Sequence, residues 1–184
     1  MANLFSTNLP LQLTSFIGRA REIADVKRLL GTTRLLTLTG AGGCGKTRLA
    51  LHVAENLLDA FPDGVWFVDL APLSDPTLIS QTIASIFDLH ESAETIAIDL
   101  LKNYLHTKNV LLVLDNCEHL IAACAQLSDT LLRACPELKI FATSREALNI
   151  AGEISFRVPS LTLPDLQNLP PVGTLAHYES IQLF

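Results

Sequence analysis

Residues 40–47 match the phosphate-binding signature G-x-x-x-x-G-K-[ST] without a mismatch. The segment reads Gly40-Ala41-Gly42-Gly43-Cys44-Gly45-Lys46-Thr47. An apolar run with high β propensity, residues 35–39, precedes it, and a helical pattern follows from Arg48. A glycine-rich turn could match by chance, but a strand before and a helix after are the context in which such a loop binds phosphate. We therefore expect the chain to bind a nucleoside triphosphate or diphosphate.

The residues of this loop have distinct chemical roles toward phosphate. Glycines at 40, 42, 43 and 45 allow tight turns, so that successive backbone N–H groups point inward. The positive end of the following helix adds to this anion site. Lys46 would reach the β- and γ-phosphates, and the Thr47 hydroxyl would ligate Mg²⁺. The expected cofactors are ATP or ADP with Mg²⁺, and the candidate binding residues are Gly40, Ala41, Gly42, Gly43, Cys44, Gly45, Lys46, Thr47 and Arg48.

The composition is that of a globular protein. Of the 184 residues, 49% are hydrophobic and 17% are charged, and the formal net charge is −6. No block of Lys and Arg offers a footprint for nucleic acid, and no apolar run has the length of a membrane span or the form of a leader. The four cysteines show neither metal-ligand spacing nor a disulfide framework. We expect a cytoplasmic segment that by itself binds neither nucleic acid nor membrane.

Strand and helix patterns alternate along the chain. Behind a phosphate-binding loop this predicts an α/β fold, a three-layer α/β/α arrangement around a five-stranded, mainly parallel sheet. We divide the chain into an extended lead-in at 1–15, a P-loop nucleotide-binding domain at 16–158, and a proline-rich loop with the start of a further helical region at 159–184. The expected strands are 34–39, 65–70, 110–115, 138–143 and 154–158, and the expected helices are about 16–31, 46–60, 74–87, 94–106 and 120–135.

Asp115 follows five apolar residues at the end of the third expected strand. In a doubly wound sheet the ligand lies at that end of the strands. The carboxylate can there hold a water of the magnesium shell, because Mg²⁺ keeps most of its waters. An aspartate that only caps the next helix is the alternative. Together with Thr47, Asp115 is the candidate metal residue.

The group that would orient an attacking water is less evident. The position after Asp115 holds Asn116, where many hydrolytic P-loop enzymes have a second acid. Glu118 is the nearest carboxylate and His119 follows it, so either could orient water. A glutamate at the start of a helix can equally serve the helix dipole. The sequence leaves both roles of Glu118 open.

Arg145 follows the fourth expected strand, at the end of the segment 143–145. Its guanidinium could touch the γ-phosphate there and report whether it is present. A surface arginine in the first turn of a helix is the alternative. The candidate catalytic residues are thus Lys46, Asp115, Glu118 and Arg145.

Several of these segments together resemble the STAND class of P-loop ATPases. Within that class the sequence looks most like the nucleotide-binding, AAA-like domain of large LuxR-type and SARP-type bacterial transcriptional regulators. The NB-ARC domains of plant immune receptors and apoptosis scaffolds are more distant likenesses. The matching segments are 11–19, 36–47, 111–119 and 142–148, within residues 9–158.

The resemblance implies further properties. It implies that Phe16, Ile17, Gly18 and Arg19 lie by the adenine and ribose, and that Arg145 senses the γ-phosphate. It also implies a module whose nucleotide state switches a multidomain regulator, in which an ADP-bound closed form opens, exchanges nucleotide and oligomerises when an inducer binds. The helical lid, winged helix, sensor repeats and DNA-binding domain of such regulators are not found in this sequence. We therefore expect them as partners of this module.

Three functions are open at this stage. The first is a regulatory ATPase whose output is conformation and whose hydrolysis of ATP is slow. The second is a metabolic P-loop kinase or transferase, although no arginine-rich lid and no acceptor site are visible. The third is a scaffold that holds nucleotide without turnover, which Asn116 favours.

Overall fold

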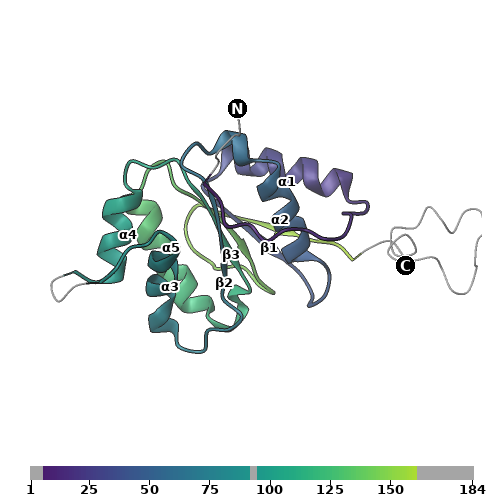
Figure 1. Cartoon of the computed structure of the whole chain (residues 1–184). Coiled ribbons are helices and arrows are strands. Elements are labelled where there is room, and N and C mark those ends of the chain that lie inside the picture. Colours follow the sequence, from purple (N-terminus) through teal and green to yellow (C-terminus); the bar gives the residue numbers. More distant parts are fainter. Residues whose placement is uncertain (1–5, 92–94, 161–184) are drawn as a thin grey trace, which may run out of the picture.

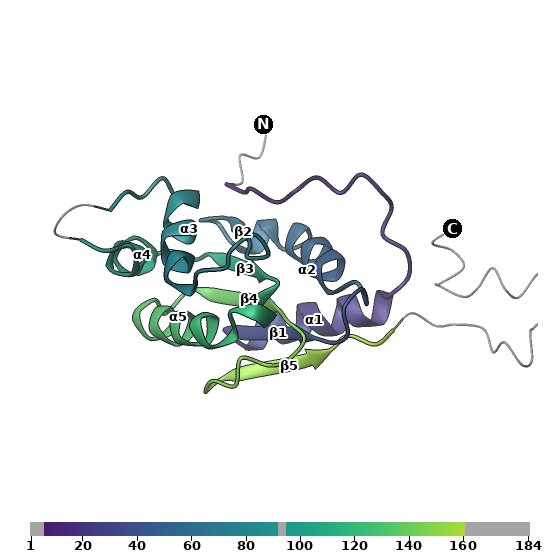
Figure 2. The same ribbon diagram turned by 90° about the horizontal axis from the view of Figure 1, so that it is seen from below.

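The protein has a central parallel sheet covered by helices on both faces (Figure 1). The computed structural model describes residues 6–91 and 95–160. All described strands run parallel, in the order β2-β3-β4-β1-β5 (Figure 2). The α/β fold expected from the sequence is therefore confirmed, and β4 lies beside β1. The strands are β1 (Leu35–Thr39), β2 (Val65–Asp69), β3 (Leu111–Asp115), β4 (Lys139–Thr143) and β5 (Glu153–Arg157).

The helices form two layers, one on each face of the sheet (Figure 1). Two of them, α1 and α2, pack on one face, and the other three pack on the opposite face. Short 3-10 turns join several of these elements. The helices are α1 (Ala20–Thr32), α2 (Lys46–Glu55), α3 (Ile79–Ile86), α4 (Ala97–Leu105) and α5 (Ile121–Ala134).

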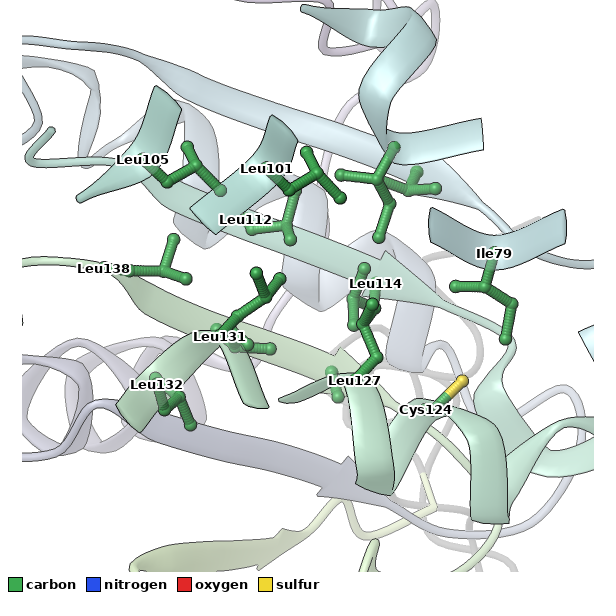
Figure 3. Close-up of a cluster of buried hydrophobic side chains, with 14 of the residues drawn as sticks. Ile79, Leu101, Leu105, Leu112, Leu114, Cys124, Leu127, Leu131, Leu132 and Leu138 are labelled. Carbon is green, nitrogen blue, oxygen red and sulfur yellow. The ribbon is translucent and has the colours of Figure 1, made fainter. Parts of the chain in front are cut away.

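Alternation along the strands divides the core in two. Successive strand residues point to opposite faces of a sheet. Val113 of β3 therefore packs with the α1 and α2 side, whereas Leu112 and Leu114 pack with the other three helices. Figure 3 shows Leu112 and Leu114 among Leu101 of α4 and Leu131 of α5. Each buried leucine side chain stabilises the fold by about 1.5–3 kcal/mol, so both layers hold the sheet firmly behind the loop.

Several helix ends differ from the sequence expectation. Helix α1 begins at Ala20 instead of residue 16, because Gly18 and Arg19 have positive φ values of 70° and 57° that no helix continues through. Helix α3 begins at Ile79 instead of residue 74, after the 3-10 turn Pro76–Leu78.

Helix α2 ends at Glu55 instead of about residue 60, and a 3-10 turn, Leu58–Ala60, follows. At this end the His52 carbonyl is shared between the Asn56 side chain at 2.6 Å and the Asn56 N–H at 3.3 Å. Helix α1 continues through Gly31 to Thr32. There the ammonium of Lys139, from β4, donates to the last carbonyls of α1. A side chain distant in sequence thus adds to the local bonds that the Thr33 N–H and the Thr32 hydroxyl make to the Leu29 carbonyl.

Parts of the expected organisation lie outside the described residues. These are positions 1–5 of the lead-in, residue 94 at the start of the expected helix 94–106, and residues 161–184 of the proline-rich region. Among the helices in the described part of the chain, none has the length and apolar character needed to cross a membrane.

The N-terminal lead-in lies along the outer edge of β2 (Figure 2). The Ser6 carbonyl accepts the Val65 N–H at 3.2 Å, and the Thr7 hydroxyl donates to the Val65 carbonyl at 2.7 Å. The Asn8 carboxamide then bonds both backbone groups of Phe67, at 2.6 and 2.8 Å. The Asn8 side chain thus makes the hydrogen bonds that a neighbouring strand would make, at an edge of the sheet where another chain could otherwise pair.

Gly64 is the residue that lets the lead-in approach β2. Its φ is 109°, and a Cβ there would lie 2.3 Å from the Ser6 carbonyl oxygen and 2.7 Å from Trp66 Nε1. We expect Gly64→Ala to lower the free energy of unfolding by about 1–3 kcal/mol, because it adds backbone strain and a clash. It should also change the emission of Trp66, the single tryptophan of the chain. Urea denaturation followed by circular dichroism and fluorescence measures both effects.

Gly31→Ala is the matched control. Gly31 is helical, and an added Cβ would have no neighbour within 4 Å. This variant should gain about 0.5–1 kcal/mol from helix propensity. If both variants change stability equally, Gly64 does not have the role assigned to it.

Candidate phosphate-binding site

The loop between β1 and α2 has the backbone conformation that an anion site needs. Gly43 and Gly45 have φ values of 76° and 85°, in the left-handed region that glycine adopts at little cost. Gly45 is also the N-cap of α2, and it supplies no side-chain bond to the first helical N–H groups. The positive end of α2 therefore keeps donors available for an anion.

The Lys46 side chain lies folded over the loop. Only 8% of the residue is exposed, and its ammonium donates to the carbonyls of Gly40 at 2.9 Å and Ala41 at 3.0 Å. The positive charge is thereby held above the loop backbone. The structure thus places the predicted lysine at the loop, and its reach to phosphate stays a prediction.

Thr47 and Asp115, the two candidate metal residues, lie in direct contact. The Thr47 hydroxyl donates to the carboxylate oxygens of Asp115 at 2.8 and 3.0 Å. Two further donors hold the same carboxylate: the Thr143 hydroxyl at 2.5 Å and the Asn116 carboxamide at 2.9 Å. The end of β3 is thereby joined to the start of α2 and the end of β4.

Asp115 is nearly buried, with 2% of the residue exposed. Burial raises the pKa of its carboxyl, the bonds from Thr143 and Thr47 lower it, and the carboxylates of Asp69 and Glu118 raise it again. The pKa of Asp115 in the folded protein therefore lies above its value in the unfolded chain. Protonation of Asp115 stabilises the fold at low pH, and this stabilisation is lost as the pH rises through the folded-state pKa. The ionised carboxylate is thus the disfavoured form, and a cation beside it would offset that cost.

The donor set fits Mg²⁺. A hydroxyl and a carboxylate are the hard oxygen ligands that this ion prefers. Within residues 6–91 and 95–160 no group of three or more His, Cys, Asp and Glu residues can hold a metal by itself. Mg²⁺ at Thr47 and Asp115 would therefore complete its shell with water and nucleotide phosphates, as it does in nucleotide sites.

Three residues of this cluster were not singled out from the sequence as site residues. Asp69 is the register partner of Asp115 across β2 and β3. The Asn116 carboxamide lies 3.4 Å from Asp69 Oδ1, while the Asn116 N–H donates to Thr143 Oγ1 at 3.1 Å. Their common signal is position, because they occupy or directly follow the last residue of a strand. Comparing the ends of adjacent parallel strands would have found them.

Arg145 and Glu118, two candidate catalytic residues, bind each other. Arg145 Nε donates to Glu118 Oε1 at 3.2 Å, and the guanidinium lies beside the loop at Gly42. His119, the other candidate for orienting water, has its Nε2 2.8 Å from the Leu73 carbonyl, after β2. The structure therefore brings Arg145 and Glu118 to the loop as a pair and directs His119 to another segment.

Of the candidate residues before α1, Arg19 contacts the loop directly. Arg19 is 5% exposed, and its Nη2 donates to the Cys44 carbonyl at 2.6 Å and to the Pro159 carbonyl at 3.1 Å. Ile17 is half-buried and Gly18 is exposed. The role of these residues toward adenine and ribose stays a prediction.

Phe16 and Arg48 hold the lead-in against α2. The Phe16 ring stacks on His52, with 4.4 Å between centroids and 12° between planes. Arg48 Nη2 donates to the Thr14 hydroxyl and to the Ser15 carbonyl, both at 2.9 Å. The Arg48 side chain is thus engaged with the lead-in, and its predicted contact with nucleotide remains untested.

Comparison with known proteins places this loop in a known family. The chain matches the AAA domain family over residues 28–157, which is more than half of its length. An uncharacterized protein of Mycobacterium tuberculosis is 47% identical over 151 residues, covering 82% of this chain and 38% of the relative. A protein of the same organism, provisionally named as an HTH-type transcriptional regulator, is 46% identical over 140 residues, covering 76% and 16%. Regulatory protein AfsR of Streptomyces coelicolor is 32% identical over 133 residues, covering 62% and 13%.

The chain spans well under half the length of these relatives. Among solved structures, a Signal Transduction ATPase with Numerous Domains (STAND) protein from Pyrococcus horikoshii superposes with a TM-score of 0.61 at 18% identity, covering 86% of this chain and 25% of that one. Cdc6p from Pyrobaculum aerophilum gives a TM-score of 0.56 at 17% identity, covering 80% and 46%. At these identities the likeness shows the fold alone, which is that of the STAND protein's matching region. The chain belongs to the AAA domain family.

Proposed function

We propose that this chain is the nucleotide-binding module of a multidomain regulator, a switch that binds ATP or ADP with Mg²⁺. The observation that carries the proposal is the contact between Thr47 and the Asp115 carboxylate at 2.8 Å, beside a complete phosphate-binding loop. A buried carboxylate without a cationic partner costs stability, and a magnesium ion with its phosphates is the partner that this loop provides for.

Different residues of the site would bind the phosphates, the Mg²⁺ ion and the γ-phosphate of ATP. The loop N–H groups and the end of α2 would hold the phosphates, and Lys46 would place its charge on the β- and γ-phosphates. Thr47 and Asp115 would hold Mg²⁺, which neutralises phosphate charge when bound. Arg145, beside Gly42, would contact the γ-phosphate that ATP has and ADP lacks. A ligand shifts a conformational equilibrium only through such differential contacts.

The relatives support the regulatory part of the proposal. Two of them carry the names of regulators, and this chain spans only 16% and 13% of their lengths. We infer that this module works with further domains, among them a helical lid, a winged helix, a sensor and a DNA-binding domain of a LuxR-type or SARP-type regulator. Cytoplasmic location and nucleotide-dependent oligomerisation belong to the same proposal.

Slow or absent turnover is part of the proposal as well. The residue after Asp115 is Asn116, and its carboxamide lies between two carboxylates. Glu118 is engaged with Arg145. We therefore expect hydrolysis of ATP below about 1 s⁻¹, the lower end of typical enzymes. A scaffold that holds nucleotide without turnover would release no phosphate in a single-turnover assay, and a kinase or transferase would transfer it to an added acceptor.

Removing the loop lysine should weaken nucleotide binding. A charge-assisted hydrogen bond contributes about 1.5–3 kcal/mol, so Lys46→Ala should lower affinity roughly 10- to 150-fold by isothermal titration calorimetry. Lys102→Ala is the control, because Lys102 belongs to α4 and pairs with Asp99 at 2.6 Å. Unchanged affinity in Lys46→Ala would refute the assignment of the loop.

Removing the metal carboxylate should act mainly through Mg²⁺. Asp115→Ala should remove most of the difference between nucleotide affinity in magnesium and in EDTA, because the residue would hold the ion and not the phosphates. The affinity in EDTA should stay within about threefold of the parent chain, well below one tenfold step. If affinity in EDTA falls as far as affinity in magnesium, Asp115 does not serve the metal.

Removing the candidate sensor should affect ATP and ADP differently. Arg145→Ala should weaken a non-hydrolysable ATP analogue by at least about fivefold and leave ADP nearly unchanged, since only ATP has the γ-phosphate. Arg133→Ala is the matched control, because Arg133 is equally exposed and pairs with Asp129 on α5. Equal losses for both nucleotides would make Arg145 a general phosphate contact, and no loss would make it a surface arginine.

A further inference from the structure

Both carboxylate oxygens of Glu118 are removed from free contact with solvent, one by a partner and one by burial. Glu118 lies in the short 3-10 turn Cys117–His119 that follows β3, and its side chain is 23% exposed. Its Oε1 accepts from Arg145 Nε, whereas Oε2 is buried and receives no hydrogen bond from any described residue. A carboxylate that orients a water needs an oxygen which the water can reach. This arrangement disfavours the role of a general base.

The contact with Glu118 favours one orientation of the Arg145 side chain. Its side chain is 69% exposed, and an exposed arginine without a partner would populate many rotamers. Nε faces Glu118. Nη2 and Cζ lie 3.6 and 4.0 Å from the point that a Cβ would occupy if Gly42 carried a side chain. One edge of the guanidinium is thus bound to Glu118, and another edge lies in contact distance of the phosphate-binding loop.

The number of donors on arginine permits both contacts together. A guanidinium carries five N–H donors in a rigid planar fork. Glu118 uses only the one on Nε, and no residue in the described ranges 6–91 and 95–160 accepts from Nη1 or Nη2. The Nη groups remain available for an anion at the loop while Nε stays bound. A phosphate oxygen at the loop therefore does not have to break the ion pair in order to reach Arg145.

We propose that Glu118 is a positioning residue for Arg145, which holds the guanidinium over the loop so that its Nη groups meet the terminal phosphate of ATP. This inference rests on the proposed function and assigns to Glu118 a role different from both sequence alternatives. The pair adds little to stability, because an exposed ion pair contributes about 0–1 kcal/mol. Its effect should appear in the discrimination between ATP and ADP.

A double-mutant cycle tests the proposal. The chain, Glu118→Ala, Arg145→Ala and the double variant are titrated with ADP and with a non-hydrolysable ATP analogue at one magnesium and salt concentration. The quantity compared is the affinity for the ATP analogue divided by the affinity for ADP. Glu118→Ala should lower this ratio about threefold or more, and the double variant should be no lower than Arg145→Ala. Glu118→Gln, which keeps an acceptor for Nε, should retain at least half of the ratio.

Controls separate positioning from a structural role. Asp129→Ala removes the carboxylate of the comparable pair with Arg133, at 2.8 Å, and should leave the ratio unchanged. The free energy of unfolding of Glu118→Ala should stay within about 1 kcal/mol of the parent chain. If Glu118→Ala lowers the affinity ratio while its free energy of unfolding is unchanged, the result supports Glu118 as a positioning residue for Arg145.

The outcomes distinguish this inference from the proposed function. If Arg145→Ala lowers the ratio and Glu118→Ala does not, the sensor stands and the role of Glu118 is overturned. If Arg145→Ala leaves the ratio unchanged, the proposed sensor fails and the inference fails with it. If both Glu118→Ala and Glu118→Gln slow single-turnover hydrolysis more than about 100-fold at an unchanged ratio, Glu118 acts as a base and positioning is refuted.

Discussion

The site depends on one buried carboxylate at the end of β3. Asp115 accepts hydrogen bonds from Thr47, Thr143 and Asn116, and these residues come from α2, the end of β4 and the turn after β3. Such bonds compensate a buried negative charge only in part, and the carboxylates of Asp69 and Glu118 oppose its ionisation. A divalent cation beside the ionised carboxylate would balance its charge and favour that form. The position of that charge beside Thr47 ties the metal site to the phosphate loop.

Two arginines in different environments lie beside the loop. Arg19 is buried and bonds the Cys44 carbonyl together with the Pro159 carbonyl, which is 140 residues away in sequence. Arg145 is exposed and lies beside Gly42, oriented by Glu118. The first arginine fixes the loop to the scaffold, since buried bonds of this kind are costly to lose. The second has donors to spare and is the one suited to respond to a ligand.

The sequence predicted those features that depend on local pattern. The loop signature, the apolar strand before Asp115 and the alternation of strands with helices are all read within short windows, and a parallel sheet brings strand ends to one edge. The position of Asp115 beside Thr47 follows from these alone. Long-range side-chain contacts were out of reach. Neither the pairing of Glu118 with Arg145 nor the Asn8 bonds that imitate a strand has a sequence signal, because both depend on rotamers and tertiary packing.

The C-terminal end of α1 was mispredicted, by one residue, for the same physical reason. Gly31 was expected to end α1, but Lys139 from β4 satisfies the last carbonyls and the helix continues to Thr32. Local propensity is a weak guide where tertiary contacts supply the cap.

Hydrogen exchange tests most directly the claim that nucleotide identity is converted into shape here. Exchange of backbone amides is compared for the chain alone, with ADP, and with a non-hydrolysable ATP analogue, always with Mg²⁺. We predict slower exchange at residues 40–48 with either nucleotide, and slower exchange at 116–119 and 143–148 only with the ATP analogue. Identical protection of 116–119 and 143–148 by both nucleotides would contradict the account.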